Sequence, residues 1–181
     1  MMTLLIVFIG GIIASTFAAI GGGVGLLSLP LLMLAGLPPQ VAVATSRVGL
    51  LGLTISGAYK FAKEGKILWQ YVLPLSIISV IGSVIGTQLL VSMDARLLNV
   101  VIGILMLATL PLLYLKKEAV GRTTTRGKWL LCLAVYAVIR IYAGLFGGGA
   151  ATLEFITIER FTDMDLVEAN GATRIPSLLA A

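Results

Sequence analysis

The sequence contains no histidine and a single cysteine, Cys132, which lies inside an apolar run. Without histidine the chain cannot form a Ser–His dyad, a histidine zinc site or a histidine acid–base pair, which excludes most intramembrane hydrolases. One cysteine allows neither a disulfide framework nor a thiolate metal site within a single chain. We therefore expect neither an enzyme nor a protein that holds a metal.

Charged residues are also scarce, at 12% of the chain, whereas about a quarter of the residues in soluble globular proteins are charged. Hydrophobic residues make up 59% and form uninterrupted runs, not the alternating pattern of barrel strands. Within a bilayer, helices satisfy the backbone of such runs internally. The composition therefore predicts an all-α, polytopic transmembrane protein with lipid as its surroundings.

The apolar runs predict the positions of the helices, because about 20 apolar residues span a bilayer as a helix. The run at 24–37 is shorter and follows a glycine cluster, so it is either a half-helix or a re-entrant arm. A cleaved signal peptide is disfavoured because no basic residue precedes the first run. Gly82 and Gly86 predict close packing of helices. The predicted helices cover Met1–Ile20, Val24–Leu37, Pro39 or Gln40 to about Tyr59, Trp69–Val91, Leu97–Leu115 and Trp129–Phe146.

The basic residues gather in two short segments that flank apolar runs. We expect the protein in the inner (plasma) membrane. The positive-inside rule then places the loops at 60–67 and 116–128 in the cytoplasm and the Ser92–Arg96 loop on the outside. The net charge of +5 does not indicate nucleic-acid binding, because the basic residues do not share one surface.

The end of the chain repeats motifs from its beginning. The glycines at 21–23 recur at 147–149, and the Ala-Val-Ala-Thr-Ser-Arg segment that ends at Arg47 is echoed by a segment that ends at Arg174. Inverted repeats with broken helices are typical of secondary transporters. We expect a first transmembrane repeat at 1–117, a cytoplasmic loop at 118–127 and an incomplete second repeat at 128–181. Either a longer protein or a second chain in a homodimer completes that repeat, or the second repeat is degenerate.

Five motifs of the first repeat occur in a recognisable order: Gly-Gly-Gly at 21–23, Leu29-Pro30, Gly-Leu-Pro-Pro at 36–39, Ala-Val-Ala-Thr-Ser at 42–46, and Lys-x-Gly-x-Ile-x-Trp from Lys63 to Trp69. In these motifs the chain resembles the TauE/SafE sulfite-exporter family. The resemblance implies transport of small sulfur-containing anions or organosulfonates across the plasma membrane, without a cofactor. The second repeat departs from the pattern, with Phe155-Ile156 where the first has Leu29-Pro30.

Glycine clusters that open helices, each followed by an arginine, suggest an anion site. Free N–H groups and the positive end of a helix dipole attract anions, and an arginine within a membrane helix is a site candidate by default. The alternatives are that the glycines serve packing, that the arginines tie to carbonyls or carboxylates, and that the hydroxyls bond to the preceding turn. The predicted substrate-binding residues are Gly21, Gly22, Gly23, Thr45, Ser46, Arg47, Gly147, Gly148, Gly149, Asn170, Thr173 and Arg174.

Arg140 lies deep within its predicted helix, and Glu154 is the acidic residue nearest to it in sequence. A pair between the two favours a structural role for both. If Glu154 faces the cavity, it could instead exchange a proton and couple transport to the proton gradient.

These features together predict a secondary transporter that binds a small anion between two halves and works by alternating access. An anion channel or pore would use the same arginines without a coupled conformational cycle. A membrane scaffold subunit that transports nothing is the third possibility.

Overall fold

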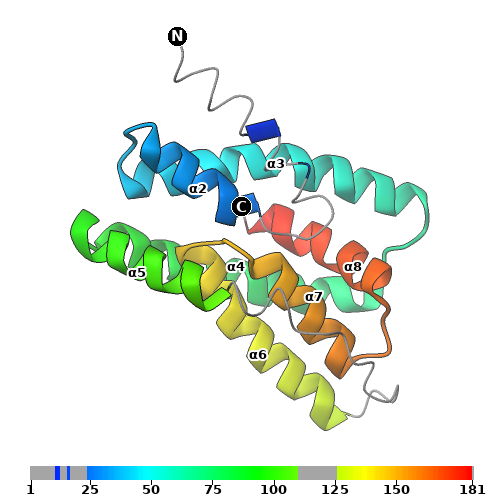
Figure 1. The fold of residues 1–181 in the computed structure, drawn as a ribbon. Helices are drawn as coiled ribbons and strands as arrows, with labels where there is room; N and C mark the ends of the chain where they lie inside the picture. The colour runs from blue at the N-terminus through cyan, green and yellow to red at the C-terminus, as the bar shows by residue number, and fades with distance from the viewer. Residues whose placement is uncertain (1–10, 13–15, 17–23, 110–125, 181) are drawn as a thin grey trace.

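The structure, a computed structural model, describes residues 11–12, 16, 24–109 and 126–180. Helices and short turns make up these residues, and no strand occurs among them, which confirms the all-α prediction (Figure 1). The labelled helices are α2 (Val24–Leu34), α3 (Pro39–Lys63), α4 (Trp69–Ser92), α5 (Ala95–Thr109), α6 (Arg126–Leu145), α7 (Ala150–Phe161) and α8 (Leu166–Leu179).

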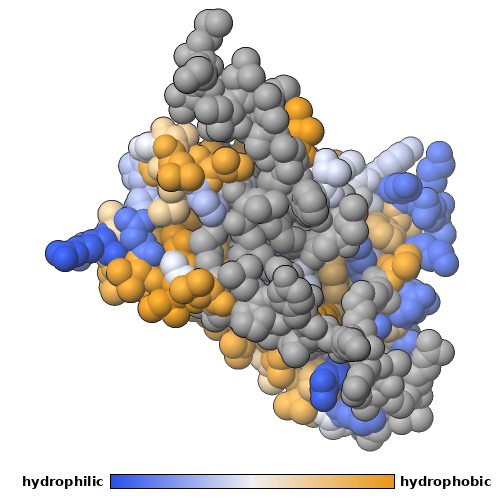
Figure 2. All heavy atoms as spheres, in the orientation of Figure 1, coloured by the Kyte–Doolittle hydropathy of each residue, from blue (hydrophilic) through white to orange (hydrophobic). Residues whose placement is uncertain are grey.

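Three of the described helices, α3, α4 and α6, are long and apolar enough to cross a membrane. Large apolar side chains remain exposed along them, such as Leu73 and Ile81 of α4 and Val138 of α6. Figure 2 shows hydrophobic side chains over the left and lower parts of the visible face, with hydrophilic ones at the left tip and along the right side. Such apolar surfaces are stable in lipid, so the chain is a polytopic helical membrane protein.

Helices α4 and α6 pack closely because glycines let their backbones approach. A Cβ atom added at Gly86 would lie 2.7 Å from the Cα of Gly144, and one added at Gly82 would lie 2.7 Å from the Cβ of Arg140. The predicted packing role of Gly82 and Gly86 is therefore confirmed. Because both contacts advance in the same direction along the two helices, α4 and α6 run parallel.

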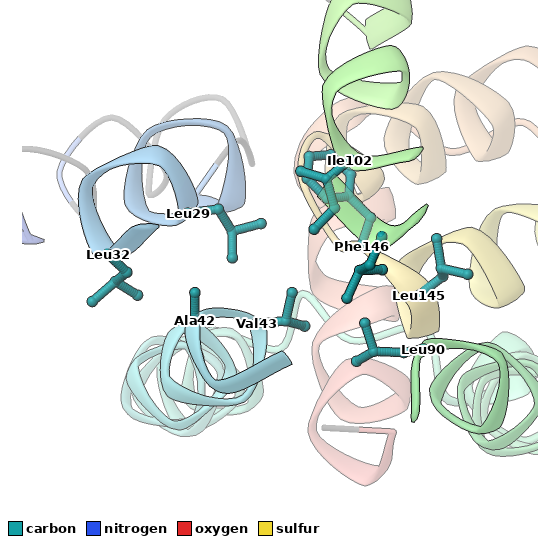
Figure 3. Packing of buried hydrophobic residues seen from close by; sticks show 9 residues of the cluster. Leu29, Leu32, Ala42, Val43, Leu90, Ile102, Leu145 and Phe146 are labelled. Atoms are coloured by element: carbon teal, nitrogen blue, oxygen red, sulfur yellow. The ribbon is translucent and has the colours of Figure 1, made fainter. Parts of the chain in front are cut away.

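The buried apolar residues form two clusters at opposite ends of the α4–α6 pair. One cluster contains Leu90 of α4 and Phe146, which follows α6, together with the start of α3 and residues of α2 and α5 (Figure 3). The other contains Leu75 of α4, Tyr136 of α6 and residues of α7 and α8. We call these the α5-end cluster and the α8-end cluster.

The hairpins α2–α3 and α7–α8 have their turns at opposite ends of the molecule. Leu37, in the α2–α3 turn, packs against the α5-end cluster, whereas Met164, in the α7–α8 turn, belongs to the α8-end cluster. Figure 1 shows α8 running alongside α3 in the opposite direction. This arrangement is the one that an inverted repeat requires.

Several predicted helix ends differ from the structure. Helix α2 ends at Leu34 because Gly36 adopts a left-handed conformation with φ of 91°, three residues before the predicted end at Leu37. Helix α3 continues to Lys63, so Lys60 and Lys63 lie in its last turn, where cations complement the helix dipole, and not in a loop. Arg96 lies in α5, and α6 begins at Arg126.

Most of the predicted helix Met1–Ile20, the glycines at 21–23 and the end of the predicted helix Leu97–Leu115 lie outside the described residues.

Candidate functional site

A cavity of about 100 Å³ lies between the two apolar clusters. This volume exceeds the space that a water molecule needs several times over and suits a small oxyanion. Residues of α3, α4, α6, α7 and α8 line the cavity, so helices from both ends of the described chain contribute to its wall. Its charged and hydroxyl-bearing lining residues are Ser46, Arg47, Ser83, Arg140, Glu154 and Ser177.

Arg47 projects from α3 to the last turn of α6. Its Nη2 atom donates to the carbonyl of Ala143 at 3.0 Å and to that of Gly144, and its Nη1 atom donates to Thr87 Oγ1 at 3.1 Å. The last carbonyls of a helix have no partners within it, and a cation there is favourable. Arg47 therefore makes the bonds to backbone carbonyls that the sequence analysis gave as the alternative to anion binding. It also lines the cavity.

Arg140 and Glu154 form the buried pair that the sequence anticipated as one possibility. Arg140 Nη2 lies 3.0 Å from Glu154 Oε2, and the two residues are only 5% and 2% exposed. Arg140 also donates to Tyr136 Oη from Nε at 2.8 Å and to Ser177 Oγ from Nη2 at 2.8 Å. Because Glu154 lines the cavity as well, the structure leaves room for both a structural and a proton-exchanging role.

The glycine segment before α7 borders the cavity. Gly147 and Gly149 have φ values of 79° and 75°, which side-chain-bearing residues rarely adopt. A Cβ at Gly148 would lie 2.5 Å from the ring of Phe146, and its carbonyl accepts a hydrogen bond from Tyr142. Gly147 lines the cavity together with Ala150 and Ala151. The first turn of α7, with its positive dipole end, therefore opens beside Arg47.

The predicted hydroxyl ligands bond back to their own helices. Thr45 donates to the carbonyl of Val41, and Ser46 donates to that of Val43. Thr173 donates to the carbonyls of Ala169 and Asn170. Only Ser46 among these three hydroxyl residues lines the cavity.

Arg174, the repeat counterpart of Arg47, lies elsewhere. Its side chain packs against Gly57 of α3, and its guanidinium carbon lies 5.8 Å from the ring centroid of Phe61. Of the predicted set, Ser46, Arg47, Gly147, Arg140 and Glu154 line the cavity, whereas Thr45, Gly148, Gly149, Asn170, Thr173 and Arg174 do not. Gly21, Gly22 and Gly23 lie outside the described residues.

The sequence did not single out Ser83, Tyr136 or Ser177. Tyr136 lies one turn before Arg140 on the same face of α6, a spacing that could have identified it as a partner. Ser83 lies between the packing glycines Gly82 and Gly86, and Ser177 lies beyond the repeated motif. No local pattern marks these two serines, because only the crossing of helices brings them to the cavity.

The family described as sulfite exporter TauE/SafE matches residues 6–181. A "Probable membrane transporter protein" of Haemophilus influenzae is 28% identical over 95% of this chain and 68% of its own length. The ORF9 protein of Sinorhizobium sp, with the same description, is 27% identical over 85% of this chain and 61% of its own length. YdhB of Bacillus subtilis is 27% identical over 97% of this chain and 73% of its own length.

The chain thus spans between 61% and 73% of the length of these three relatives. No solved structure matches it. The match over nearly all of its residues agrees with the helical membrane fold and with the family resemblance seen in the motifs. The chain therefore belongs to the sulfite exporter TauE/SafE family of membrane proteins.

Proposed function

We propose that the protein carries a small anion, sulfite or an organosulfonate, across the inner membrane by alternating access. The observation that supports this most is the cavity that helices from both ends of the described chain enclose, with Arg47 and the Arg140–Glu154 pair in its wall. Two arginines against one carboxylate give the described cavity lining an excess of positive charge, which favours an anion. Membership of the family and the printed names of the relatives support transport.

The two apolar clusters suit the role of gates. Along α4, Leu75 belongs to the α8-end cluster, Ser83 lines the cavity and Leu90 belongs to the α5-end cluster. On α4 the two clusters therefore lie on either side of the residue that lines the cavity. In an alternating-access cycle each cluster would open in turn, while the binding residues stay near the middle of the membrane.

An oxyanion in the cavity would meet donors of several kinds. Arg47 supplies a guanidinium group, and the first turn of α7 supplies the positive end of a helix dipole. The Ser177 hydroxyl accepts a hydrogen bond from Arg140, so its own hydrogen is available to an anion. Ser46 and Ser83 could turn from their own helices to donate to the same ligand.

Counterflow distinguishes a carrier from a channel. Vesicles that contain the protein and are loaded with unlabelled sulfite should accumulate labelled sulfite transiently and with saturable kinetics. A continuous conductance in a planar bilayer, without counterflow, would instead support a pore. Neither conductance nor counterflow with sulfite and a panel of organosulfonates would contradict transport and favour a scaffold subunit.

Binding tests the assignment of Arg47. Arg47→Lys keeps the charge but loses the planar fork, so the stabilisation that sulfite gives the purified protein against heat should need about tenfold more sulfite. Arg47→Gln should abolish that stabilisation. Thr87→Val removes a partner of Arg47 outside the cavity lining and controls for lost hydrogen bonds.

Arg174→Gln removes an equivalent charge that does not line the cavity, and it should keep the sulfite response. Stabilisation of Arg47→Gln that equals the parent's would move the site elsewhere. Loss in Arg174→Gln, with retention in Arg47→Gln, would point to the repeat counterpart as the site.

A further inference from the structure

Arg47 joins two helices that do not pack along each other. Helix α3, which carries Arg47, packs along α2 and α8, whereas α6 packs along α4 and α7. The guanidinium group spans from α3 to the end of α6, where its Nη2 atom donates to the carbonyls of Ala143 and Gly144. We call these two hydrogen bonds the Arg47 clamp.

The clamp lies beside the α5-end cluster. Val43 of that cluster lies one turn before Arg47 on α3, and Leu145 directly follows Gly144 (Figure 3). Phe146, the next residue, belongs to the same cluster and also lines the cavity. A movement of α3 away from the end of α6 would therefore loosen the α5-end cluster at a side chain that borders the cavity.

A bound oxyanion competes for the hydrogens that form the clamp. A guanidinium group has two edges that can donate a pair of parallel hydrogen bonds, one formed by Nε and Nη2 and the other by Nη1 and Nη2. Both edges use a hydrogen of Nη2, and in Arg47 the α6 carbonyls accept both hydrogens of that atom. Because Arg47 lines the cavity, an oxyanion there that binds either edge must displace one of these carbonyls.

The Gly144 carbonyl can release Arg47 without losing every partner. The Thr87 hydroxyl of α4 donates to this carbonyl at 3.4 Å and accepts a hydrogen bond from Arg47 Nη1 at 3.1 Å. A charged oxyanion is also a stronger acceptor for a guanidinium group than a neutral carbonyl is. The exchange of carbonyl for anion is therefore favourable.

Building on the proposed anion transport, we infer that Arg47 couples occupancy of the cavity to opening of the α5-end cluster. A bound oxyanion takes the place of an α6 carbonyl on Nη2, and α3 then separates from the end of α6. Without an anion, the clamp holds this end closed. The same arginine thus recognises the cargo and releases one gate of the alternating-access cycle.

The distance between α3 and α4, against which α6 packs, reports on the clamp. In a Cys132→Ala background, Val41→Cys and Val91→Cys place two exposed labelling sites next to residues of the α5-end cluster. Tyr59→Cys and Leu73→Cys form a reference pair near the other end of the same helices. Electron–electron double resonance between nitroxides on thioether bonds measures both distances in purified protein. Methanesulfonate is the added anion because, unlike sulfite, it does not react with the labels.

In the parent, methanesulfonate should add a longer-distance population to the first pair and leave the reference pair unchanged. Arg47→Gln removes the clamp, so it should show the longer population without any anion, and an unchanged reference distance would show that it is folded. Arg174→Gln removes an arginine that packs against α3 near its other end, and both of its distances should respond as in the parent.

The outcomes separate this inference from the proposed function. A first-pair distance that stays the same or shortens, in parent protein that methanesulfonate stabilises against heat, would overturn the inference and leave anion binding intact. A folded Arg47→Gln protein that keeps the short distance would overturn it as well, because the clamp would then not hold this end closed. If neither methanesulfonate nor sulfite stabilises the parent, the proposed function and this inference both fail.

Discussion

At the scale of single residues, the structure shows how arginines are accommodated inside apolar helices, where an unpaired charge costs at least a few kcal/mol. Arg47 binds the final carbonyls of α6, Arg140 binds Glu154 and Tyr136, and Arg174 stacks near the ring of Phe61. Each uses a different partner, so the repeat relation between Arg47 and Arg174 does not extend to their contacts. Position in the repeat is thus a weak guide to role.

The Arg140–Glu154 pair makes a prediction at this scale. Glu154→Leu leaves the Arg140 charge buried without its carboxylate, so the free energy of unfolding should fall by about 3–5 kcal/mol. In the double variant Arg140→Met with Glu154→Leu, apolar side chains fill the site, and most of the loss should be recovered. Denaturant titration in detergent would measure both. A double variant as unstable as the single one would show that the loss of stability does not come from the unpaired charge of Arg140.

At the scale of helices, the parallel contact between α4 and α6 positions the site. Its glycines hold α6 against α4, and from this position α6 places Arg140 against Ser177 of α8 and Glu154 of α7 and its own end against Arg47. The cavity wall therefore depends on a spacing that no side chain at Gly86 or Gly144 would permit.

Gly86→Val tests that spacing. A Cβ at this position would lie 2.1 Å from the carbonyl oxygen of Ile141, so α4 and α6 must separate. We expect a loss of about 1–3 kcal/mol or more in unfolding free energy, together with weaker anion binding. Gly49→Val on α3 carries the same change of residue but meets nothing within 4 Å, and it should be near neutral. Equal effects in thermal unfolding would mean that helix propensity, not packing, determines the result.

At the scale of the whole molecule, parallel α4 and α6 place their starting residues, Trp69 and Arg126, at the same end. Tyr71 and Trp129 confirm this proximity, with ring centroids 5.0 Å apart. The α3–α4 turn and the start of α6 thus share one side, as the two basic clusters require. That this side faces the cytoplasm remains a prediction from the positive-inside rule.

Cysteine labelling in intact cells tests the orientation. In a Cys132→Ala background, cysteines at Lys63 and Arg126 should resist an impermeant thiol reagent added outside, and a cysteine at Asp94 should react. Permeabilised cells should label at all three positions, which verifies their exposure. The reverse pattern, with reaction at Lys63 and Arg126 but not at Asp94, would mean that the protein is inserted the other way round.

The sequence by itself determined the helical membrane class, the family, the glycine break before α7 and Arg47, Arg140 and Glu154 as residues of interest. The class and the residues of interest follow from composition, run length, the glycine motif and the cost of charge in lipid, and the family follows from the resemblance of the motifs; all of these are properties of the sequence alone. Tertiary structure decided that Arg47 binds the end of α6, that Ser83 and Ser177 line the cavity and that Arg174 lies away from it. Those outcomes depend on how helices distant in sequence cross, because contacts between helices are set by packing that no single segment encodes.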